Sequence, residues 1–488
     1  MPVDISYIRE GKNLTFGQQI SLTARLAVPA IIAQLSTILM QYIDASMVGR
    51  LGADQSASVG LMNSSLWMFW GVCSMVTMGF SVQVAHRLGA RDNSGARDVL
   101  RQGITSCVAF GVFMAVLGMS IAPWLPGWLG GAEEIRHDST VYFLIFVAAM
   151  PILTVNYLAG GMLRCAGNMK IPGLLNAAMC VLDVLFNFFL IFPTRNVGLF
   201  GMEFVCPGAG LGVLGAALGT VMAECIIASL MAWYLLSRQR ELRLTGRGGR
   251  GSFRPTSAVL RKAARISVPM TLEHVIFCGA QITITVIVAP LGVVAIAANA
   301  FAVTAESLCY MPGFGIGDAA TTLAGQSYGA GRYGLVRRFT YLTVGLGMAV
   351  MTVMALVMYL CAPLMMGIMS PVDGIVALGS EVLRIEAWAE PMYAASIVAY
   401  GAMVGVGDTT LPAIMNFGSI WLVRIPLAAL MAPSMGLRGV WIAMCIELTF
   451  RGLIFLWRMF GKSWLKPDKK RGPETFAAEE ALADRGDM

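Results

Sequence analysis

Residues 28–52 read VPAIIAQLSTILMQYIDASMVGRLG, a run of apolar and small residues with one carboxylate, Asp44, close to its far end. A helix needs about 20 mainly apolar residues to cross the hydrocarbon layer of a membrane, and this stretch is long enough. A charged group inside such a helix is costly unless it faces a cavity or a partner. The stretch therefore predicts a membrane span that contains a functional acid.

The composition of the whole chain is typical of an integral membrane protein. Hydrophobic residues make up 57% of the 488 residues, charged residues make up 13%, and the mean hydropathy is +0.70, whereas a soluble protein carries about 25% charged residues. We expect an all-α polytopic membrane protein with twelve transmembrane helices. The expected spans lie near residues 26–48, 58–86, 102–124, 139–163, 172–193, 212–236, 266–290, 296–326, 339–362, 381–404, 411–432 and 438–459.

The sequence repeats itself at a spacing of 240 residues, because ARLAVP at 24–29 returns as ARISVP at 264–269. The same spacing relates Pro151 to Pro391, Gly161 to Gly401, Gly167 to Gly407, Pro172 to Pro412 and Asn176 to Asn416. Six spans followed by six equivalent spans give two lobes of the same orientation, an architecture typical of transporters with a substrate site between the lobes. We therefore expect two pseudo-symmetric six-helix lobes that rock to give alternating access.

Lys and Arg are concentrated in one set of connections, including the basic run 238–254, and the positive-inside rule places this set in the cytoplasm. The expected organisation is a cytoplasmic N-terminus (1–22), an N-lobe (23–237), a basic cytoplasmic linker (238–263), a C-lobe (264–460) and a cytoplasmic tail (461–488). The N-terminus lacks the apolar core of a signal peptide, so the first span is expected to direct insertion. The net charge of +7 then requires no nucleic-acid partner.

Cysteine and histidine positions indicate neither a disulfide framework nor a metal site, because nine of the ten cysteines lie in or beside expected spans and the three histidines are far apart. Motifs of zinc proteases, phosphate-binding loops and nucleophile elbows are missing from the sequence. We therefore expect no metal, no cofactor apart from a coupling ion, and no enzymatic activity.

Several motifs together resemble the multidrug and toxic compound extrusion (MATE) transporters. They are the stretch at 28–52, VAHRLGARD at 84–92, YMPGFGIGDAATTLAGQSYGAGR at 310–332, and the repeat-related MLRCAGNMKIPGLLN at 162–176 and MVGVGDTTLPAIMN at 403–416. The resemblance covers about residues 20–460. It implies a cation-coupled antiporter of a bacterial inner membrane that expels amphipathic, often cationic organic compounds through a central cavity, and for which a monomer suffices.

Within this family the pattern is similar to the DinF-like branch, which implies an ion-coupling site formed by Asp44, Asp183, Asn156 and Asn187. In that branch an Asn often precedes the fifth-span Asp by four residues, and this position holds Met179 here. Two carboxylates in one pocket favour the binding of a cation, and such a pair can load and release a proton. Carboxylate and amide oxygens also suit sodium, so both ions stay open.

Each of these residues also has a purely structural interpretation. Asp44 lies close to Arg50 in sequence and can pair with it at the membrane surface. Asn156 and Asn187 can form hydrogen bonds between helices without any contact to an ion.

The C-lobe has its own candidates for substrate or ion binding, Glu273 and Glu306, with His274 and Asp318 as weaker ones. Glu306 can alternatively form a structural ion pair with Arg384 or Arg424. Three aromatic residues are candidates for contact with organic cations, Trp67, Phe277 and Tyr310.

A flippase for lipid-linked oligosaccharides, from the same broad superfamily, is the alternative function. Its pyrophosphate cargo requires basic residues in the cavity. Arg384 and Arg424 favour this function if they face the cavity, and argue against it if they pair with Glu306 or Glu386.

Overall fold

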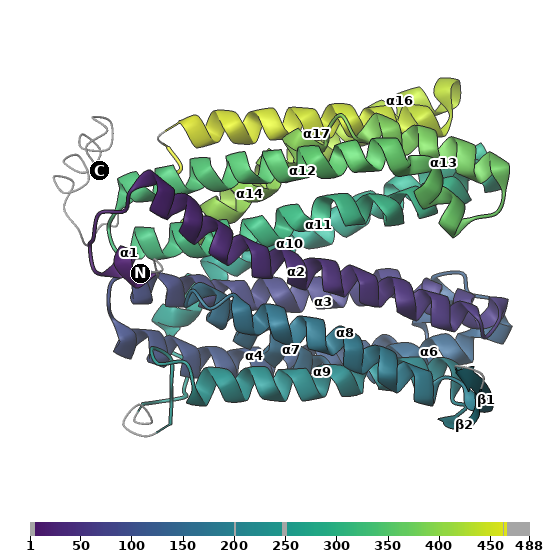
Figure 1. Ribbon diagram of the computed structural model, residues 1–488, viewed down its shortest axis with the longest axis horizontal. Coiled ribbons are helices and arrows are strands. Elements are labelled where there is room, and N and C mark those ends of the chain that lie inside the picture. The colour runs from purple at the N-terminus through teal and green to yellow at the C-terminus, as the bar shows by residue number, and fades with distance from the viewer. Residues whose placement is uncertain (1–4, 200–201, 246–250, 462, 466–488) are drawn as a thin grey trace.

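The computed structural model describes residues 5–199, 202–245, 251–461 and 463–465, which form a bundle of long helices (Figure 1). The first half contains α1 (Ser6–Arg9), α2 (Phe16–Gly49), α3 (Ala53–Gly89), α4 (Asn93–Ile121), α5 (Leu125–Trp128), α6 (Glu133–Ala148), α7 (Met150–Cys165), α8 (Lys170–Leu190), β1 (Pro193–Leu199), β2 (Met202–Ala209) and α9 (Gly212–Ser237). The second half contains α10 (Ser257–Val288), η2 (Ala289–Leu291), α11 (Val293–Gly329), α12 (Tyr333–Met369), α13 (Asp373–Glu386), α14 (Glu390–Val406), α15 (Thr410–Ser419), η3 (Ile420–Arg424), α16 (Ile425–Met435) and α17 (Leu437–Phe460).

The membrane-spanning segments follow the predicted pattern. Within the described residues, ten helices are long and apolar enough to cross a membrane, and the bent pair α6–α7 makes an eleventh. The pair α13–α14 occupies the place of the tenth expected span and completes twelve segments in two lobes. α2 and α10 begin ahead of the expected spans, so α10 takes up the end of the predicted linker 238–263; residues 246–250 of that linker, and most of the predicted tail, lie outside the described residues.

Two expected spans, 139–163 and 381–404, are broken rather than continuous. α6 and α7 meet at an angle of 49°, and three residues separate the end of α13 from the start of α14. Pro151 and Pro391 follow the two breaks at equivalent positions of the repeat. Proline lacks the amide hydrogen that the preceding turn needs and clashes with that turn. Each of these two spans is therefore divided into two helices, and the same proline position accounts for the division in both lobes.

The two lobes interlock near the N-terminal part of α2. The N-lobe and C-lobe each bury their own apolar clusters. Another cluster joins the lobes, because Leu22 and Leu26 of α2 pack with Leu323 of α11 and Phe339 of α12. α2 lies between the two halves of the bundle in Figure 1. The predicted outer loop after α8 contains the antiparallel hairpin β1–β2, and we call that end of the bundle the hairpin end.

At the opposite end, which we call the basic end, two hydrogen bonds related by the repeat join the lobes. His86 Nε2 on α3 donates to the carbonyl oxygen of Gly405 on α14 over 2.8 Å. Gln326 Nε2 on α11 donates to the carbonyl oxygen of Cys165 on α7 over 2.6 Å. Positions 86 and 326, and positions 165 and 405, each differ by 240. The duplication has therefore placed the same inter-lobe contact on both sides of the pseudo-two-fold axis.

Two glycines allow α3 and α11 to cross closely beside these bonds. A Cβ atom on Gly89 would lie 2.2 Å from the carbonyl oxygen of Gln326, and a Cβ atom on Gly329 would lie 2.2 Å from the carbonyl oxygen of His86.

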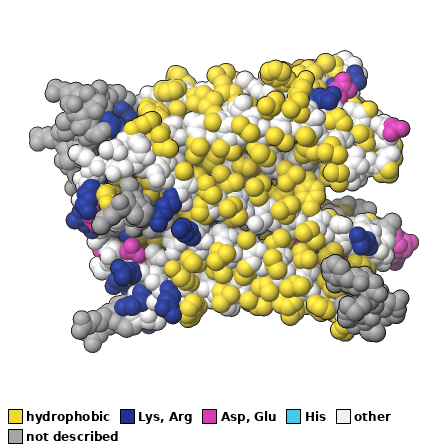
Figure 2. Space-filling view, viewed as in Figure 1, with side chains coloured by type: hydrophobic (Ala, Val, Ile, Leu, Met, Phe, Trp, Pro, Cys, Tyr) yellow, Lys and Arg dark blue, Asp and Glu magenta, His cyan; other side chains and the backbone are white. Residues whose placement is uncertain are grey.

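Figure 2 shows Lys and Arg gathered at the basic end, and a notch between the lobes at the hairpin end. The protein is closed at its basic end and open at its hairpin end.

We predict that Gly89→Ala and Gly329→Ala each destabilise the protein by about 1–3 kcal/mol, because the added methyl group overlaps backbone that cannot turn aside. Thermal unfolding of the purified protein in detergent would show lower melting temperatures for both variants. The matched control is Gly345→Ala on α12, where an added Cβ meets nothing within 4 Å. Equal melting temperatures for all three variants would contradict the close crossing.

Candidate functional site

The fold brings the three strongest N-lobe candidates into one cluster. Asn187 Nδ2 donates to Asp44 Oδ1 over 2.8 Å and to Asp183 Oδ2 over 3.1 Å. Asp183 and Asn187 lie one turn apart on α8 and are both fully buried, while Asp44 reaches them from α2. One amide group therefore bridges two carboxylates from different helices.

Room for this cluster comes from a glycine on α9. A Cβ atom on Gly219 would lie 2.1 Å from Asn187 Oδ1, so a larger residue would displace the amide. In the described part of the chain, Asp183 Oδ1 and Asn187 Oδ1 have no hydrogen-bond partner. Buried oxygens of this kind are costly to leave unpaired, and a bound proton or cation would satisfy them.

Asn156, the fourth predicted ion-coupling residue, forms a separate contact. Its Nδ2 on α7 donates to Glu224 Oε2 on α9 over 2.9 Å. Glu224 was not predicted as a site residue, although it is the one charged residue of the expected span 212–236. An isolated acid inside an expected span was the observation that identified Asp44 as a candidate, and the same observation applies to Glu224.

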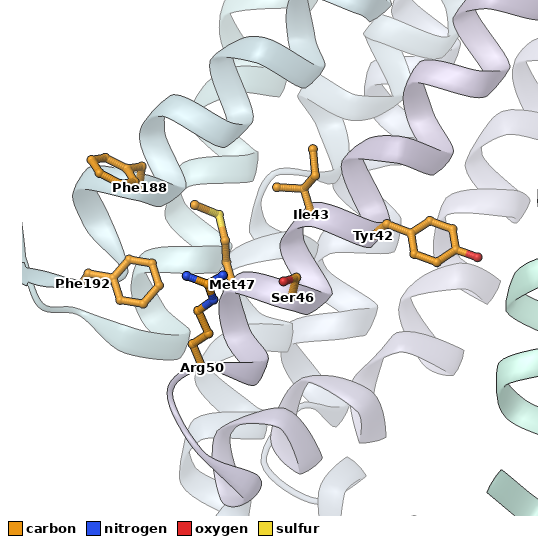
Figure 3. Close-up of a pocket in the computed structure, with 7 residues that line it drawn as sticks. All are labelled: Tyr42, Ile43, Ser46, Met47, Arg50, Phe188 and Phe192. Carbon is orange, nitrogen blue, oxygen red and sulfur yellow. The ribbon is translucent and has the colours of Figure 1, made fainter. Parts of the chain in front are cut away.

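A pocket of about 330 Å³ lies between α2 and α8 (Figure 3), and Asp44, Asp183 and Asn187 are not among its lining residues. Its lining residues are Tyr42, Ile43, Ser46, Met47, Arg50, Phe188 and Phe192. Arg50 lines the pocket, and among the described residues it forms no ion pair with Asp44. Asp44 accepts a hydrogen bond from Asn187 instead, so the structure gives no support to a pairing of Asp44 with Arg50.

In the C-lobe, Glu273 is held by two hydrogen bonds. Tyr400 Oη donates to one carboxylate oxygen over 2.6 Å, and Asn416 Nδ2 donates to the other over 2.5 Å. His274, the next residue, stacks on Trp67 of α3 with ring centroids 6.1 Å apart. Glu273 and His274 are consecutive residues of α10, but their side chains face different surroundings. The His274–Trp67 contact joins the two lobes.

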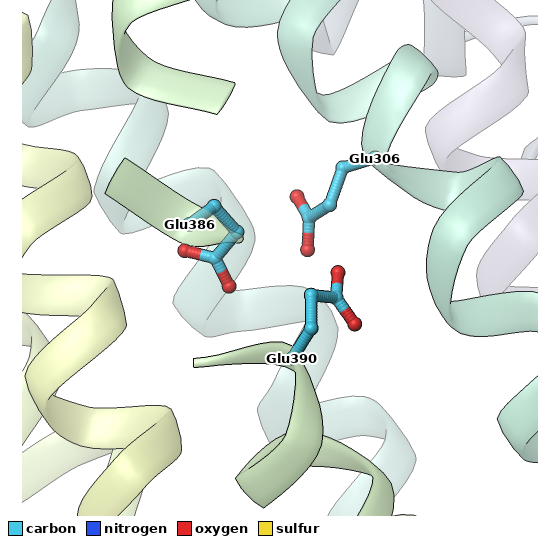
Figure 4. Close-up of side chains that lie close together, drawn as sticks. All are labelled: Glu306, Glu386 and Glu390. Atoms are coloured by element: carbon cyan, nitrogen blue, oxygen red, sulfur yellow. The ribbon is translucent and has the colours of Figure 1, made fainter. Parts of the chain in front are cut away.

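A second acidic cluster lies deeper in the C-lobe. Glu306 of α11, Glu386 of α13 and Glu390 of α14 each place a carboxylate oxygen within 4.8 Å of the others (Figure 4). Within the described residues, both carboxylate oxygens of Glu386 and of Glu390 lack a hydrogen-bond partner. Only Glu306 was predicted as a candidate, because the break between α13 and α14 that turns the other two inward is not visible in hydropathy.

The predicted ion pair between Glu306 and an arginine is replaced by a different one. Arg424 Nη2 lies 2.5 Å from Glu447 Oε2, and Arg451 Nε lies 3.2 Å from the other oxygen of Glu447. Arg384 is exposed, and its guanidinium lies over the Tyr359 ring at 5.6 Å. Arg424 is therefore neutralised inside the lobe, and Arg384 lies on its surface.

The remaining candidates have structural contacts. Tyr310 packs edge-on against Phe314 and Tyr393, and Phe277 is half-buried. Asp318 Oδ2 lies 3.8 Å from Arg164 Nε on α7, which adds an ion pair between the lobes.

Both lobes therefore contain buried carboxylate oxygens that have no hydrogen-bond partner within the described residues. Asp44 and Asp183 share one amide, and the three C-lobe glutamates face one another. Carboxylates arranged in this way can hold protons or a hard metal cation such as sodium. Anions are disfavoured at both places.

The chain matches the MatE family model over residues 29–189 and again over residues 269–430, and the two matches begin 240 residues apart. It is 25% identical over 454 residues to the probable multidrug resistance protein NorM of Thermotoga maritima, covering 91% of this chain and 92% of that protein. It is 28% identical over 430 residues to the corresponding protein of Pseudomonas aeruginosa, covering 86% and 84%.

Solved structures with the same fold include a MATE protein in complex with MaL6, with a TM-score of 0.83, 20% identity and coverage of 92% of this chain and 98% of that chain. A multidrug resistance MATE transporter in an outward-facing conformation gives a TM-score of 0.82, 21% identity and coverage of 94% and 100%. The predicted family is confirmed, and the DinF-like branch stays a prediction. The chain belongs to the MatE family of membrane transporters and is not an enzyme.

Proposed function

We propose that this transporter is a secondary multidrug exporter that exchanges amphipathic organic cations for a proton or a sodium ion. The observation that carries the proposal is the Asp44–Asn187–Asp183 cluster, in which one amide joins two carboxylates within the membrane-spanning region. The NorM relatives are named as multidrug resistance proteins, which supports the substrate class. Their bacterial origin and the multi-pass fold support a location in a bacterial inner membrane.

The site chemistry supports exchange because the cluster changes charge when a cation enters or leaves. Asp44 reaches the cluster from α2, and α2 also packs against the C-lobe near the basic end. A cation that binds between α2 and α8 would therefore alter contacts on a helix shared by both lobes. Such a helix can couple ion binding to the rocking of the lobes.

The balance of buried charges in the C-lobe supports a cationic substrate. The buried charged residues of the C-lobe, within the described chain, are four glutamates (Glu306, Glu386, Glu390 and Glu447) and three arginines (Arg424, Arg451 and Arg458); Arg458 is paired with Asp408, and the half-buried Glu273 adds a further carboxylate. An excess of carboxylates attracts cations and repels pyrophosphate. The flippase alternative loses support, since Arg424 is paired with Glu447 and Arg384 lies at the surface.

We further propose that the basic end faces the cytoplasm, as the positive-inside rule indicates. Both ends of the described chain lie at this end of the bundle (Figure 1). On this orientation the notch at the hairpin end opens outward, and the conformation is one from which a substrate is released.

Asp44→Asn and Asp183→Asn are expected to abolish gradient-driven transport, because each substitution removes the negative charge that attracts the coupling ion and the group that can take up a proton. The measurement is uptake of a fluorescent organic cation into inverted membrane vesicles, under a pH gradient alone and under a sodium gradient alone. The gradient that drives uptake in the wild type identifies the ion.

The control for these variants is Asp54→Asn, which removes an exposed carboxylate at the start of α3 and is expected to transport like the wild type. Normal uptake by both Asp44→Asn and Asp183→Asn would show that the two acids are structural. The coupling site would then have to lie elsewhere.

Glu273→Gln is expected to raise the apparent KM for an organic cation while transport stays coupled to the gradient, because the substitution removes a charge outside the N-lobe cluster. Initial rates of uptake as a function of substrate concentration provide the test. Glu381→Gln, which removes an exposed carboxylate that pairs with Arg438, is the control. An unchanged KM for Glu273→Gln would exclude this glutamate from substrate attraction.

A further inference from the structure

The N-terminal segment ahead of the first span lies across both lobes at the basic end. We call residues 5–14 the N-terminal strap. Its apolar side chains Ile5, Ile8 and Leu14 are 5%, 0% and 4% exposed, and they join the apolar cluster that connects α2 to the C-lobe. Ile5 also packs on Gly167, whose φ of +89° and missing side chain leave space for it. The strap is thus packed into the protein and does not lie free on its surface.

A single side chain of the strap is hydrogen-bonded to both lobes. Arg9 Nε donates to Gln326 Oε1 of the C-lobe over 2.9 Å. In the N-lobe half, Arg9 Nη1 donates to Glu241 Oε1 over 2.8 Å and Nη2 donates to the carbonyl oxygen of Ala166 over 2.9 Å. The guanidinium group has five donors in a fixed plane, and here three of them bridge the junction.

The backbone of the strap is held from both sides as well. Arg91, in the connection between α3 and α4, donates from Nε to the carbonyl oxygen of Arg9. Arg332, in the connection between α11 and α12, donates from Nη1 to the carbonyl oxygen of Lys12 over 2.9 Å. Arg91 is the one residue other than glycine with a positive φ, at 60°, within the described chain. A strained backbone is retained where surrounding contacts require it, and one such contact is with the strap.

The strap acts on one member of the symmetric pair of inter-lobe hydrogen bonds. Gln326 uses its amide nitrogen for Cys165 and its amide oxygen for Arg9. Its counterpart in the repeat, His86, bonds to Gly405 through Nε2. The duplicated fold supplies the inter-lobe closure twice, and the strap reinforces it on the Gln326 side.

We propose that the N-terminal strap is a latch that holds the basic ends of the lobes together, with Arg9 as the residue that locks it. The inference rests on the alternating access of the proposed function, because opening the basic end separates Gln326 from Cys165. Arg9 cannot keep its bonds to Gln326 and to Ala166 when the two lobes part there. Contacts that exist in one state bias the equilibrium toward that state. Release of Arg9 is therefore a step of the transport cycle.

A native cysteine reports whether the latch is closed. Cys165 lies at this junction and is 2% exposed, whereas Cys107 is 0% exposed inside the N-lobe core. The measurement is the rate at which a membrane-impermeant maleimide modifies each cysteine in the purified full-length protein in nanodiscs, resolved by peptide mass spectrometry. The rate at Cys165 follows the population in which the basic end is open, provided that closing is faster than the reaction.

We expect Arg9→Gln to accelerate modification of Cys165 several-fold. Arg9→Lys is expected to do the same, because a lysine keeps the charge but cannot reach three acceptors in one plane. Lys12→Gln is the matched control: it removes a positive charge three residues away, from a side chain that is 55% exposed and pairs with Glu10. This control and the Cys107 rate should stay at wild-type values.

A second variant, lacking residues 2–12, removes the latch while it retains the Thr15–Gln18 capping box at the start of α2. It should accelerate modification of Cys165 at least as much as Arg9→Gln. Unchanged Cys165 rates in both variants would show that the strap is passive. Acceleration at Cys107 as well as Cys165 would mean general loosening of the fold and would also refute the latch. The assay needs neither substrate nor gradient, so its result is independent of whether organic cations are exported.

Discussion

The cost of placing a carboxylate in a medium of low dielectric constant is the constraint on which this structure depends. Each acid that the spans carry must meet a hydrogen-bond donor, a cation or water. Asp44 and Asp183 meet this demand by sharing the Asn187 amide, and Glu273 meets it through Tyr400 and Asn416. Where the demand is not met by the protein itself, as at Glu386 and Glu390, the unpaired oxygens mark places suited to a proton or a cation.

The duplication supplies the scaffold, and departures from it supply the chemistry. The prolines after the two breaks (Pro151 and Pro391), the glycines at 89 and 329, and the paired inter-lobe hydrogen bonds all follow the spacing of 240 residues. The acids do not. Asp44 and Asp183 correspond to Ile284 and Val423, while Glu306 corresponds to Leu66. Two lobes with nearly the same frame therefore present different buried charges, which allows them to bind different species.

Much of the fold could be predicted from the sequence, because span length and the repeat are encoded in local hydropathy and in fixed spacing. Asp183 and Asn187 could also be placed together, since residues four apart on a helix share one face. The break at Ala387–Ala389 could not be predicted from hydropathy, since a bent and a straight apolar segment have the same composition. Glu386 and Glu390 were missed for this reason, and Glu224 was missed because no motif was expected on α9. The choice of Glu447 over Glu306 as the partner of Arg424 depends on tertiary packing alone.

Exchange at the Asp44–Asn187–Asp183 cluster requires the organic cation and the coupling ion to compete for the protein. Equilibrium binding of a fluorescent organic cation to the purified transporter can be measured over a range of pH and of sodium concentration. We expect the affinity for the organic cation to fall as the coupling ion becomes more concentrated, and this dependence to disappear when Asp44 and Asp183 are both replaced by Asn. Affinity that is independent of pH and of sodium in the wild type would contradict exchange at this cluster.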